Sequence, residues 1–548
     1  MYPRTPARTP ERNRTLDRSR HPNAADDAPS ASPAEDAPSA SPAEEALAAE
    51  LAAVRPELAD AYAAALDGAR AAVLTRLWRA LAFEPLPWVV RRDRGSGGLA
   101  LTLAGGRRLE GPLPDPFATR PYVRELSLDG TAYRQAAQLV TALDVPYGKE
   151  FAAELDDSTA SLALSRAGAG AAADEEAPLT PWAWEQRVVD GHPYHPNCRS
   201  RPGFSVAEQL AYAPEHRQVV RLGLVAVSAE ECLVTGDWPD RLRDGGRLLV
   251  PVHPWQSAHV LTRLPVVDAF PAHPLMALRT LAPETGGTDR TDPTGGAHVK
   301  TALSTRLTSS VRDISVYSVE TAAAVSAFAQ TLSERLDGLL HVTRTLGAVS
   351  AHSPDLAAVL REPPEVYADP SAGEQVLPVA ALASFGPARS AAWQTAFARL
   401  ALSVCLRALE LGVALEAHGQ NLLVVLSATG APVRLVYRDL ADIRISPARL
   451  RRHGMPVPPV SGRLITDEVG DLRRKLFGSL VTGALGSTAG SAASFAGLLA
   501  EAASLTPTAD IEALLTGPLP TKALTLMRLS PGVPGDQWAE LPNPLTGG

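Results

Sequence analysis

The spacing of apolar residues changes twice along this 548-residue chain, and these changes constrain its fold more than any other feature. Between Ala46 and Ala82, apolar side chains recur every three or four residues, which indicates one or two amphipathic helices. Residues 180–318 contain short β-type segments separated by loops, and the pattern beyond Val319 is mainly helical. The chain is therefore predicted to be an α+β protein with a β-rich middle region and a mainly helical C-terminal region.

Local patterns predict further elements inside these regions. Apolar runs broken by glycines predict a hairpin or meander over residues 88–112, and LLVVLSATGAPVRLVYRDL predicts a hairpin over residues 422–440. Stretches rich in glycine predict a connector at residues 167–176 and a mobile surface loop at 284–296. Helices are predicted for residues 122–155, 320–346, 391–411, 467–485 and 492–505.

The N-terminal segment differs in composition from the rest of the chain. Residues 27–44 contain the unit DAPSASPAE twice in succession. Such Pro-, Ser- and Ala-rich sequence buries too little apolar surface to offset the entropy of ordering, so residues 1–45 are predicted to be a disordered tail. The remaining patterns divide the chain into residues 46–155, 156–318 and 319–548.

Composition excludes several classes of protein. A net charge of -8 with 20% charged residues gives no reason to expect a nucleic-acid partner. The three cysteines, Cys198, Cys232 and Cys405, form no CxxC pair, which argues against a disulfide scaffold and for a reducing compartment. No apolar run reaches the roughly 18 residues of a membrane span, and no apolar segment follows the N-terminal arginines as a secretory signal requires. We therefore expect a cytoplasmic protein without a membrane partner.

Residues 191–203 read GHPYHPNCRSRPG and allow three interpretations. The spacing of His192, His195 and Cys198 suits zinc, but the two prolines prevent a regular helix and no second Cys/His pair follows. Arg199 and Arg201 fit an anion-binding loop, because guanidinium groups pair with carboxylate or phosphate oxygens. A solvated polar loop is the third possibility.

Two segments of the β-rich middle region carry further candidates. In PVHPWQ, His253 and Gln256 follow a strand-like run, where they would line a site or only pack in a turn on the core. In HVKTALSTRLTSSVRDIS, Lys300, Thr308 and Arg312 would bind a polyphosphate if they lie on one face, whereas an exposed amphipathic strand is the alternative. Arg279 and Thr280 precede this segment and would be further phosphate ligands in the first case.

Polar residues also gather around the late hairpin, in EAHGQNLLV and then YRDL. Protein kinases place an Asn and a later Asp in this order around Mg²⁺ and ATP, although the spacing alone is a weak signal. Carboxylate and amide oxygens are suitable ligands for Mg²⁺. The P-loop, the dinucleotide-binding glycine motif, the GxSxG elbow and HExxH do not occur. The residues concerned are Glu416, His418, Gln420, Asn421, Arg438 and Asp439.

Taken in order, HPYHPNCRSRPG, VHPWQ, Lys-x7-Thr-x3-Arg, EAHGQNLL and Arg-Asp resemble the IucA/IucC family of siderophore synthetases over roughly residues 120–500. The resemblance implies an ATP-dependent ligase that adenylates a carboxylate, releases pyrophosphate and transfers the acyl group to an amine or alcohol. It also implies a cupped-hand fold, with a thumb at 46–155, fingers at 156–318 and a distantly kinase-like palm at 319–548. ATP and Mg²⁺ are the implied cofactors, and a homodimer is possible.

The resemblance assigns roles to individual positions of this chain. It implies catalytic roles for Lys300, Arg312, His192 and His195, and nucleotide contacts for Arg279, Lys300, Thr308, Arg312, His418, Gln420 and Asn421. Substrate contacts are implied for His195, Arg199, Arg201, His253 and Gln256, and metal contacts for Glu416, Asn421 and Asp439.

Two departures from the family pattern affect the substrate more than the reaction class. Arg199 stands where the family usually has Lys, and Ala277 stands where it usually has Ser. The competing interpretations are the same chemistry in another metabolite pathway, a kinase-like phosphotransferase, and a nonenzymatic zinc- or anion-binding protein.

Overall fold

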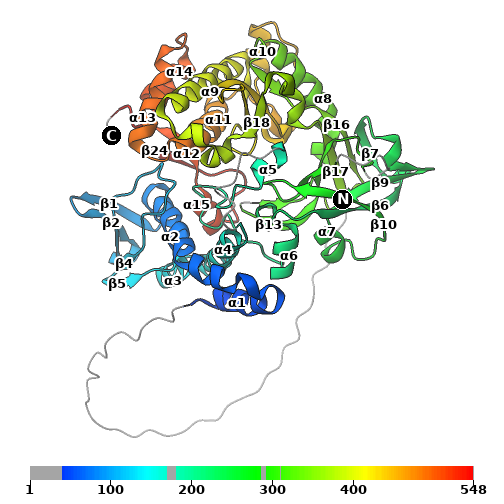
Figure 1. Cartoon of the computed structure of the whole chain (residues 1–548). Helices are drawn as coiled ribbons and strands as arrows, with labels where there is room; N and C mark the ends of the chain where they lie inside the picture. Colours follow the sequence, from blue (N-terminus) through cyan, green and yellow to red (C-terminus); the bar gives the residue numbers. More distant parts are fainter. Residues whose placement is uncertain (1–39, 170–179, 285–291, 309, 547–548) are drawn as a thin grey trace, which may run out of the picture. The chain divides into compact units, whose positions relative to one another are not determined.

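The computed structural model describes residues 40–169, 180–284, 292–308 and 310–546, and Pro42–Gly548 forms one compact unit. Most of the predicted tail, and parts of the predicted connector and surface loop, lie outside the described residues. Helix α1 (Pro42–Val54) includes residues 42–45, the last four of the predicted disordered tail, so that part of the prediction is wrong. The mixture of helices and sheets confirms the α+β prediction (Figure 1).

The N-terminal part packs helices against a small antiparallel sheet. Helices α1 and α2 (Ala59–Phe83) confirm the predicted amphipathic stretch, and the meander over residues 88–112 is also confirmed. The helix predicted over residues 122–155 is wrong in its first half, which forms a hairpin because Asp129 and Gly130 both adopt positive φ in a tight turn. The elements are β1 (Val89–Gly95), β2 (Gly98–Leu103), β3 (Arg108–Gly111), β4 (Leu126–Leu128), β5 (Thr131–Tyr133), α3 (Ala136–Leu143) and α4 (Gly148–Ala169).

An antiparallel sheet of nine strands forms the middle of the described chain, in the order β7-β16-β17-β12-β11-β10-β6-β9-β8. Helices α5 (Pro181–Glu185) and α6 (Val206–Tyr212) precede the first strand of this sheet, and α7 (Pro254–His259) connects β9 and β10. The strands are β6 (Val220–Ser228), β7 (Leu233–Gly236), β8 (Arg243–Asp244), β9 (Arg247–Val252), β10 (Val266–Pro274), β11 (Thr280–Pro283), β12 (His298–Thr301), β16 (Thr345–Ser350) and β17 (Ala357–Arg361).

Two strands of this sheet follow helix α8 (Val316–Glu334), where the sequence predicts only helix up to residue 346. That prediction is wrong beyond Glu334, because Asp337 and Gly338 adopt positive φ and end the helical run. Strands β15 (Leu340–Val342) and β16 then follow. The sheet thus draws strands from both sides of residue 318, and the division at 318/319 stays a prediction.

The C-terminal part is mainly helical around a smaller sheet, β15-β21-β20-β18. Strands β20 (Leu422–Leu426) and β21 (Pro432–Tyr437) confirm the late hairpin. Helix α11 (Val469–Leu476) continues as a π-helix (Phe477–Leu485). Further elements are β13 (Leu303–Leu307), β14 (Ser310–Arg312), β18 (Gln375–Pro378), α9 (Ala391–Leu411), β19 (Val413–Ala414), β22 (Arg444–Ile445), α10 (Pro447–Arg452), α12 (Gly486–Ala489), α13 (Ala492–Ala500), α14 (Ala509–Thr516), β23 (Leu519–Lys522), α15 (Leu524–Leu529) and β24 (Trp538–Leu541).

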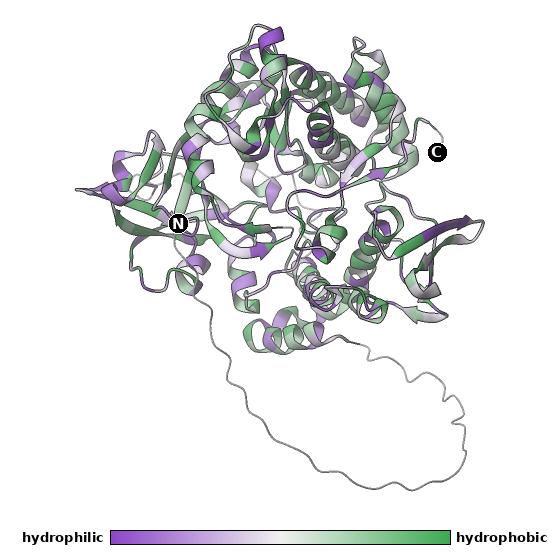
Figure 2. Ribbon diagram, turned by 180° about the vertical axis from the view of Figure 1, so that it is seen from behind, coloured by the Kyte–Doolittle hydropathy of each residue, from purple (hydrophilic) through white to green (hydrophobic). Residues whose placement is uncertain are grey.

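The largest hydrophobic core lies in this C-terminal part, where α8, α9 and the π-helix pack around the smaller sheet. Figure 2 shows the contrast with strand β1, whose arginines make it strongly hydrophilic. Within the described ranges, no helix is both long and apolar enough to cross a membrane. The two sheets therefore rest on separate cores, and polar residues at the ends of their strands meet between them.

Candidate functional site

A cluster of basic residues surrounds one carboxylate where the two sheets meet. Lys300 on β12 places its Nζ 2.7 Å from Asp439 Oδ2, and Arg361 at the end of β17 places Nη2 3.5 Å from Oδ1. The antiparallel pairing of β12 with β17 sets Lys300 and Arg361 on the same face of the large sheet. Asp439 follows β21 of the smaller sheet, so this contact joins the two sheets.

Arg279 and Arg312 complete what we call the basic cluster, defined as Arg279, Lys300, Arg312 and Arg361. Arg279 Nη1 donates to the carbonyl oxygens of Arg312 and Asp313, the latter at 2.7 Å. Arg312 donates through Nη2 to Thr308 Oγ1 and through Nε to the Leu307 carbonyl oxygen at 3.0 Å. The structure therefore brings together four of the residues predicted to bind phosphate, namely Arg279, Lys300, Thr308 and Arg312.

Backbone strain is concentrated at this point of the fold. Leu278, Thr308 and Asp439 all adopt positive φ, of 65°, 58° and 74°. Positive φ is costly for side chains that carry a Cβ, and most of all for β-branched Thr. Each residue is in the basic cluster's hydrogen-bond network or next to a member of it, so the surrounding contacts fix the local geometry.

Burial shifts the pKa values of these charged groups. Desolvation lowers the pKa of Lys300 to about 8, against the opposing effect of Asp439, and lowers that of Arg279 to about 10. The pKa of Asp439 lies well below its usual range, because Lys300 and Arg361 outweigh its own desolvation. The basic cluster thus carries three more positive charges than the carboxylate that it contacts, and the Asp439 side chain is 28% exposed. This arrangement favours binding of an anion with several charges.

The loop between β19 and β20 provides the opposite wall. His418 Nδ1 accepts a hydrogen bond from Gln420 N at 3.3 Å, and Asn421 Nδ2 donates to the Glu416 carbonyl oxygen at 3.3 Å. The Tyr437 hydroxyl accepts from Glu416 N at 3.2 Å and donates to the Asp439 carbonyl oxygen at 3.1 Å. Tyr437 therefore links the backbones of Glu416 and Asp439, two of the predicted metal-binding residues.

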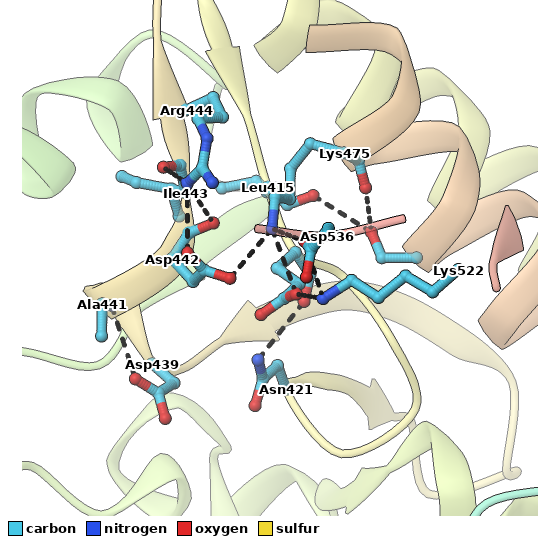
Figure 3. Close-up of polar contacts among 12 residues, drawn as sticks. Leu415, Asn421, Asp439, Ala441, Asp442, Ile443, Arg444, Lys475, Lys522 and Asp536 are labelled. Carbon is cyan, nitrogen blue, oxygen red and sulfur yellow. Dashed lines mark hydrogen bonds and ion pairs between the residues drawn. The ribbon is translucent and has the colours of Figure 1, made fainter. Parts of the chain in front are cut away.

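Two lysines that the sequence did not single out as site residues, Lys475 and Lys522 (both labelled in Figure 3), contact the Glu416 carboxylate. Lys475 and Lys522 place Nζ 3.2 and 3.1 Å from Glu416 Oε1. Lys475 also contacts Asp442 at 2.9 Å, and Lys522 contacts Asp536 at 3.1 Å. The Glu416 charge is therefore neutralised by neighbouring ammonium groups.

A magnesium ion fits these residues only with additional ligands. The donors at Glu416, Asn421 and Asp439 are hard oxygens of the kind Mg²⁺ prefers, but both oxygens of Asp439 face basic groups. Across the described part of the chain, no three His, Cys, Asp or Glu residues lie together as a metal site. The donor set suits Mg²⁺ that is bound mainly by phosphates, with one or two carboxylates.

His192 and His195 lie beside the same site. Both ring nitrogens of His195 are buried without a hydrogen bond of normal geometry to described residues, and burial with nearby Arg312 lowers its pKa to about 3. His192 is exposed, yet desolvation and neighbours that include His195 and His418 hold its pKa well below the usual value. A residue that is both accessible and surrounded by protein is expected on the wall of a cleft. The zinc interpretation is wrong, because these residues and Cys198 form no metal group.

The sequence led us to expect that Arg199 and Arg201 bind an external anion. In the structure both arginines contact a carboxylate of the same chain. Arg201 Nη2 contacts Glu215 Oε1, and Arg199 Nη1 lies 3.5 Å from Glu215 Oε2. Arg199 also donates to the carbonyl oxygens of Val188 and Val189. The anion that these arginines bind is therefore a fully buried carboxylate of the same chain.

His253 and Gln256 are fully buried and make internal contacts. His253 Nδ1 accepts from Trp255 N at 3.2 Å and caps α7. Gln256 Nε2 donates to Ser304 Oγ and the Asp355 carbonyl oxygen, both at 2.9 Å. Neither side chain reaches the basic cluster in these contacts, and their predicted substrate contacts stay predictions.

Sequence reasoning missed Arg361, Lys475 and Lys522. The rarity of lysine was the available signal for two of them, since the chain has four lysines and three lie around this site. Arg361 ends a buried strand, a position where a charged residue needs a partner.

Residues 180–384 match the model of the IucA / IucC family, and residues 391–530 match that of the ferric iron reductase FhuF-like transporter family. A relative from Staphylococcus aureus, 2-[(L-alanin-3-ylcarbamoyl)methyl]-3-(2-aminoethylcarbamoyl)-2-hydroxypropanoate synthase, is 23% identical over 47% of this chain and 51% of its own length. The chain spans about half the length of the curated relatives it matches.

Two solved structures share the fold. The petrobactin biosynthesis protein AsbB from Bacillus anthracis superposes with a TM-score of 0.68 at 18% identity, covering 89% of this chain and 98% of that one. ATP-bound aerobactin synthetase IucA from Klebsiella pneumoniae gives a TM-score of 0.65 at 21% identity, covering 87% and 99%. Residues 180–384 are thus similar to the IucA / IucC family, and the chain shares the fold of these two solved structures.

Proposed function

We propose that this protein is an ATP-dependent ligase that adenylates a carboxylic acid and condenses it with an amine or alcohol in siderophore biosynthesis. The observation that carries the proposal is the excess of positive charge in the basic cluster around the partly exposed Asp439. A triphosphate would neutralise that excess. The family match and the ATP-bound IucA structure support the choice of ATP as the anion.

The proposed acid is citrate or a related carboxylate. Relatives include the Staphylococcus aureus synthase and a Bacillus anthracis citryl-spermidine/3,4-dihydroxybenzoyl-citryl-spermidine:spermidine ligase, which is 23% identical over 318 residues. Both names describe products or substrates that contain carboxylates joined to amines. The second substrate of this chain is accordingly an amine or alcohol.

In the first proposed step, a carboxylate oxygen attacks the α-phosphorus of ATP and the bond to pyrophosphate breaks. Negative charge then develops on the phosphate oxygens, where Lys300 and Arg312 stabilise it. Because their contacts with Asp439 and Thr308 position both groups before reaction, little reorganisation is needed. Asp439 and Asn421 would hold Mg²⁺ beside the nucleotide, where the ion would neutralise further phosphate charge.

In the second step, the amine or alcohol attacks the acyl carbon, AMP leaves and the nucleophile loses a proton. Low pKa values keep His192 and His418 uncharged at neutral pH, so each has an imidazole nitrogen able to accept that proton. Gln420 N donates to Nδ1 of His418, so Nδ1 is the unprotonated nitrogen and accepts the proton once this hydrogen bond is released, while Nε2 carries the ring's own hydrogen. We also propose that residues 46–155, 156–318 and 319–548 correspond to thumb, fingers and a kinase-like palm.

The test is incubation of the protein with ATP, Mg²⁺, a panel of carboxylates and hydroxylamine. Acyl hydroxamate formed together with pyrophosphate and AMP supports the proposal and identifies the acid. Release of ADP instead would show a phosphotransferase, and the absence of any nucleotide turnover with the whole panel would refute the ligase.

A further inference from the structure

Glu185 is a buried carboxylate, at the end of α5, for which the proposed reaction has no direct use. Its oxygens accept two parallel hydrogen bonds from Arg438, from Nη1 at 2.6 Å and from Nη2 at 2.9 Å. Oε2 also accepts from Met276 N at 3.1 Å. The side chains of Glu185 and Arg438 are 3% and 7% exposed, so the pair is desolvated on both sides.

Each contact of this pair fixes a segment that carries a site residue. Arg438 directly precedes Asp439, and its Nε donates to the Gln420 carbonyl oxygen at 3.0 Å. The Arg438 backbone N–H donates to the Asn421 carbonyl oxygen at 3.0 Å. One guanidinium thus ties the end of β21 to the loop that carries Gln420 and Asn421.

The bond from Met276 ties the same carboxylate to the large sheet. Met276 begins the turn that leads through Leu278, with φ of 65°, to Arg279. Thr280, the next residue, pairs with Lys300 in the sheet. Glu185 therefore lies between the segment of Arg279 and the segment of Asp439, which belong to different sheets.

A second carboxylate would compete for Arg438 if Glu185 were lost. Glu365 lies close enough to interact with Arg438, and burial raises its pKa to about 7. Its Oε2 has no hydrogen-bond partner among the described residues, and His298 Nε2 lies 3.8 Å from Oε1. Without Glu185, Arg438 would turn toward Glu365 and release the Gln420 carbonyl oxygen.

We propose that Glu185 is a positioning residue that sets the spacing between the two walls of the nucleotide site through Arg438 and Met276. The proposal rests on the proposed function, since the ligand held between these walls is ATP. Glu185 touches no reacting atom. Its loss changes how well Arg279 and Lys300 on one wall, and Asp439 on the other, reach the phosphates together.

The test compares Glu185→Gln, the double variant Glu185→Leu with Arg438→Met, and the wild type. Glu374→Gln is the matched control, because Glu374 also binds an arginine, Arg434, through both oxygens but makes none of these contacts. The double variant keeps the test valid if Glu185→Gln does not fold, since replacing both members of a buried ion pair by apolar residues is often neutral for stability. The measurements are the Kd of a nonhydrolysable ATP analogue, KM for ATP, kcat and the thermal midpoint.

We expect both Glu185 variants to raise the analogue Kd and the KM for ATP at least about tenfold, with a smaller effect on kcat and with the double variant as stable as the wild type. The control should bind like the wild type. Wild-type affinity in the double variant would overturn the inference, and so would an equal loss in the control. A wild type that binds no nucleotide would instead refute the proposed function, so the two failures are distinguishable.

Discussion

The lowered pKa of Lys300 predicts how the activity depends on pH. Phosphate binding needs the charged ammonium, and burial lowers the pKa of this group to about 8. As pH rises above 8, free enzyme loses the charge, so kcat/KM for ATP should fall. The fall in kcat should occur at a higher pH than the fall in kcat/KM, because bound phosphates favour the protonated lysine.

The magnitude follows from that value. With a pKa of about 8, roughly one lysine in ten is protonated at pH 9, so kcat/KM should be about tenfold below its plateau. Arginine has an ordinary pKa above about 12, and burial in this cluster lowers that of Arg279 only to about 10. Lys300→Arg should therefore shift the fall in kcat/KM from about pH 8 to about pH 10 or above, at some loss of activity near neutral pH from the different geometry.

Unfolding does not explain a fall of activity between about pH 8 and 10.5. The folded pKa of Lys300 lies below its ordinary value of 10.5, so between about pH 8 and 10.5 the unfolded chain binds more protons at this group. Its contribution to the free energy of unfolding therefore increases with pH over this range. A loss of kcat/KM there reflects the charge of the site.

The assay is the initial rate of pyrophosphate release at low ATP between pH 6.5 and 10, on a scale of roughly half a pH unit per point. Lys149→Arg is the matched control, because Lys149 is exposed on α4 away from the basic cluster. If kcat/KM falls with pH in Lys300→Arg as it does in the wild type, the reasoning is refuted. A shift of this fall in the control Lys149→Arg would refute it equally.

Three further changes test other parts of the site. Lys300→Ala and Arg312→Ala should each lower turnover at least ~100-fold in a folded protein, and near-normal activity of both would reject the site. Cys198→Ser should leave activity within about twofold, since the hydrogen bonds of its thiol to described residues involve Arg76 and the Asp190 carbonyl oxygen; a large loss would give it a role in the site. Glu215→Gln should destabilise the fold by about 3–5 kcal/mol in denaturant melts, because two buried arginines lose their counter-charge, and an unchanged midpoint would contradict this.

The sequence predicts the fold class because helices and hairpins depend on local patterns, whereas its predicted site residues come from the family resemblance of the ordered motifs. Helices and hairpins with clear periodicity, such as residues 46–82 and 422–440, form as expected. The errors occur where a turn interrupts a helical pattern, at Asp129 and at Asp337, since single residues with positive φ override periodicity. The order of the motifs along the chain also predicts that Lys300, Arg312 and Asp439 lie together, although it does not predict the distances between them.

Partners distant in the chain could not be predicted in this way. Arg199 and Arg201 have the composition of an anion-binding loop, and they do bind a carboxylate, but nothing local to 191–203 identifies Glu215 as that carboxylate. The same holds for Glu185 and Arg438, which are 253 residues apart. Residue types reveal that a charge needs a partner, whereas only the fold decides whether the partner is internal or a ligand.

That distinction separates the structural arginines of this protein from those available to a ligand. Arg201 and Arg438 each contact a buried carboxylate at hydrogen-bond distance, so their charge is balanced inside the chain. Lys300 and Arg361 share the carboxylate of Asp439, whereas the hydrogen bonds that Arg279 and Arg312 donate to described residues go to carbonyl and hydroxyl oxygens. A buried positive charge without a matching carboxylate is costly unless an anion joins it. We therefore interpret the excess positive charge where the two sheets meet as a binding site for a polyanionic substrate.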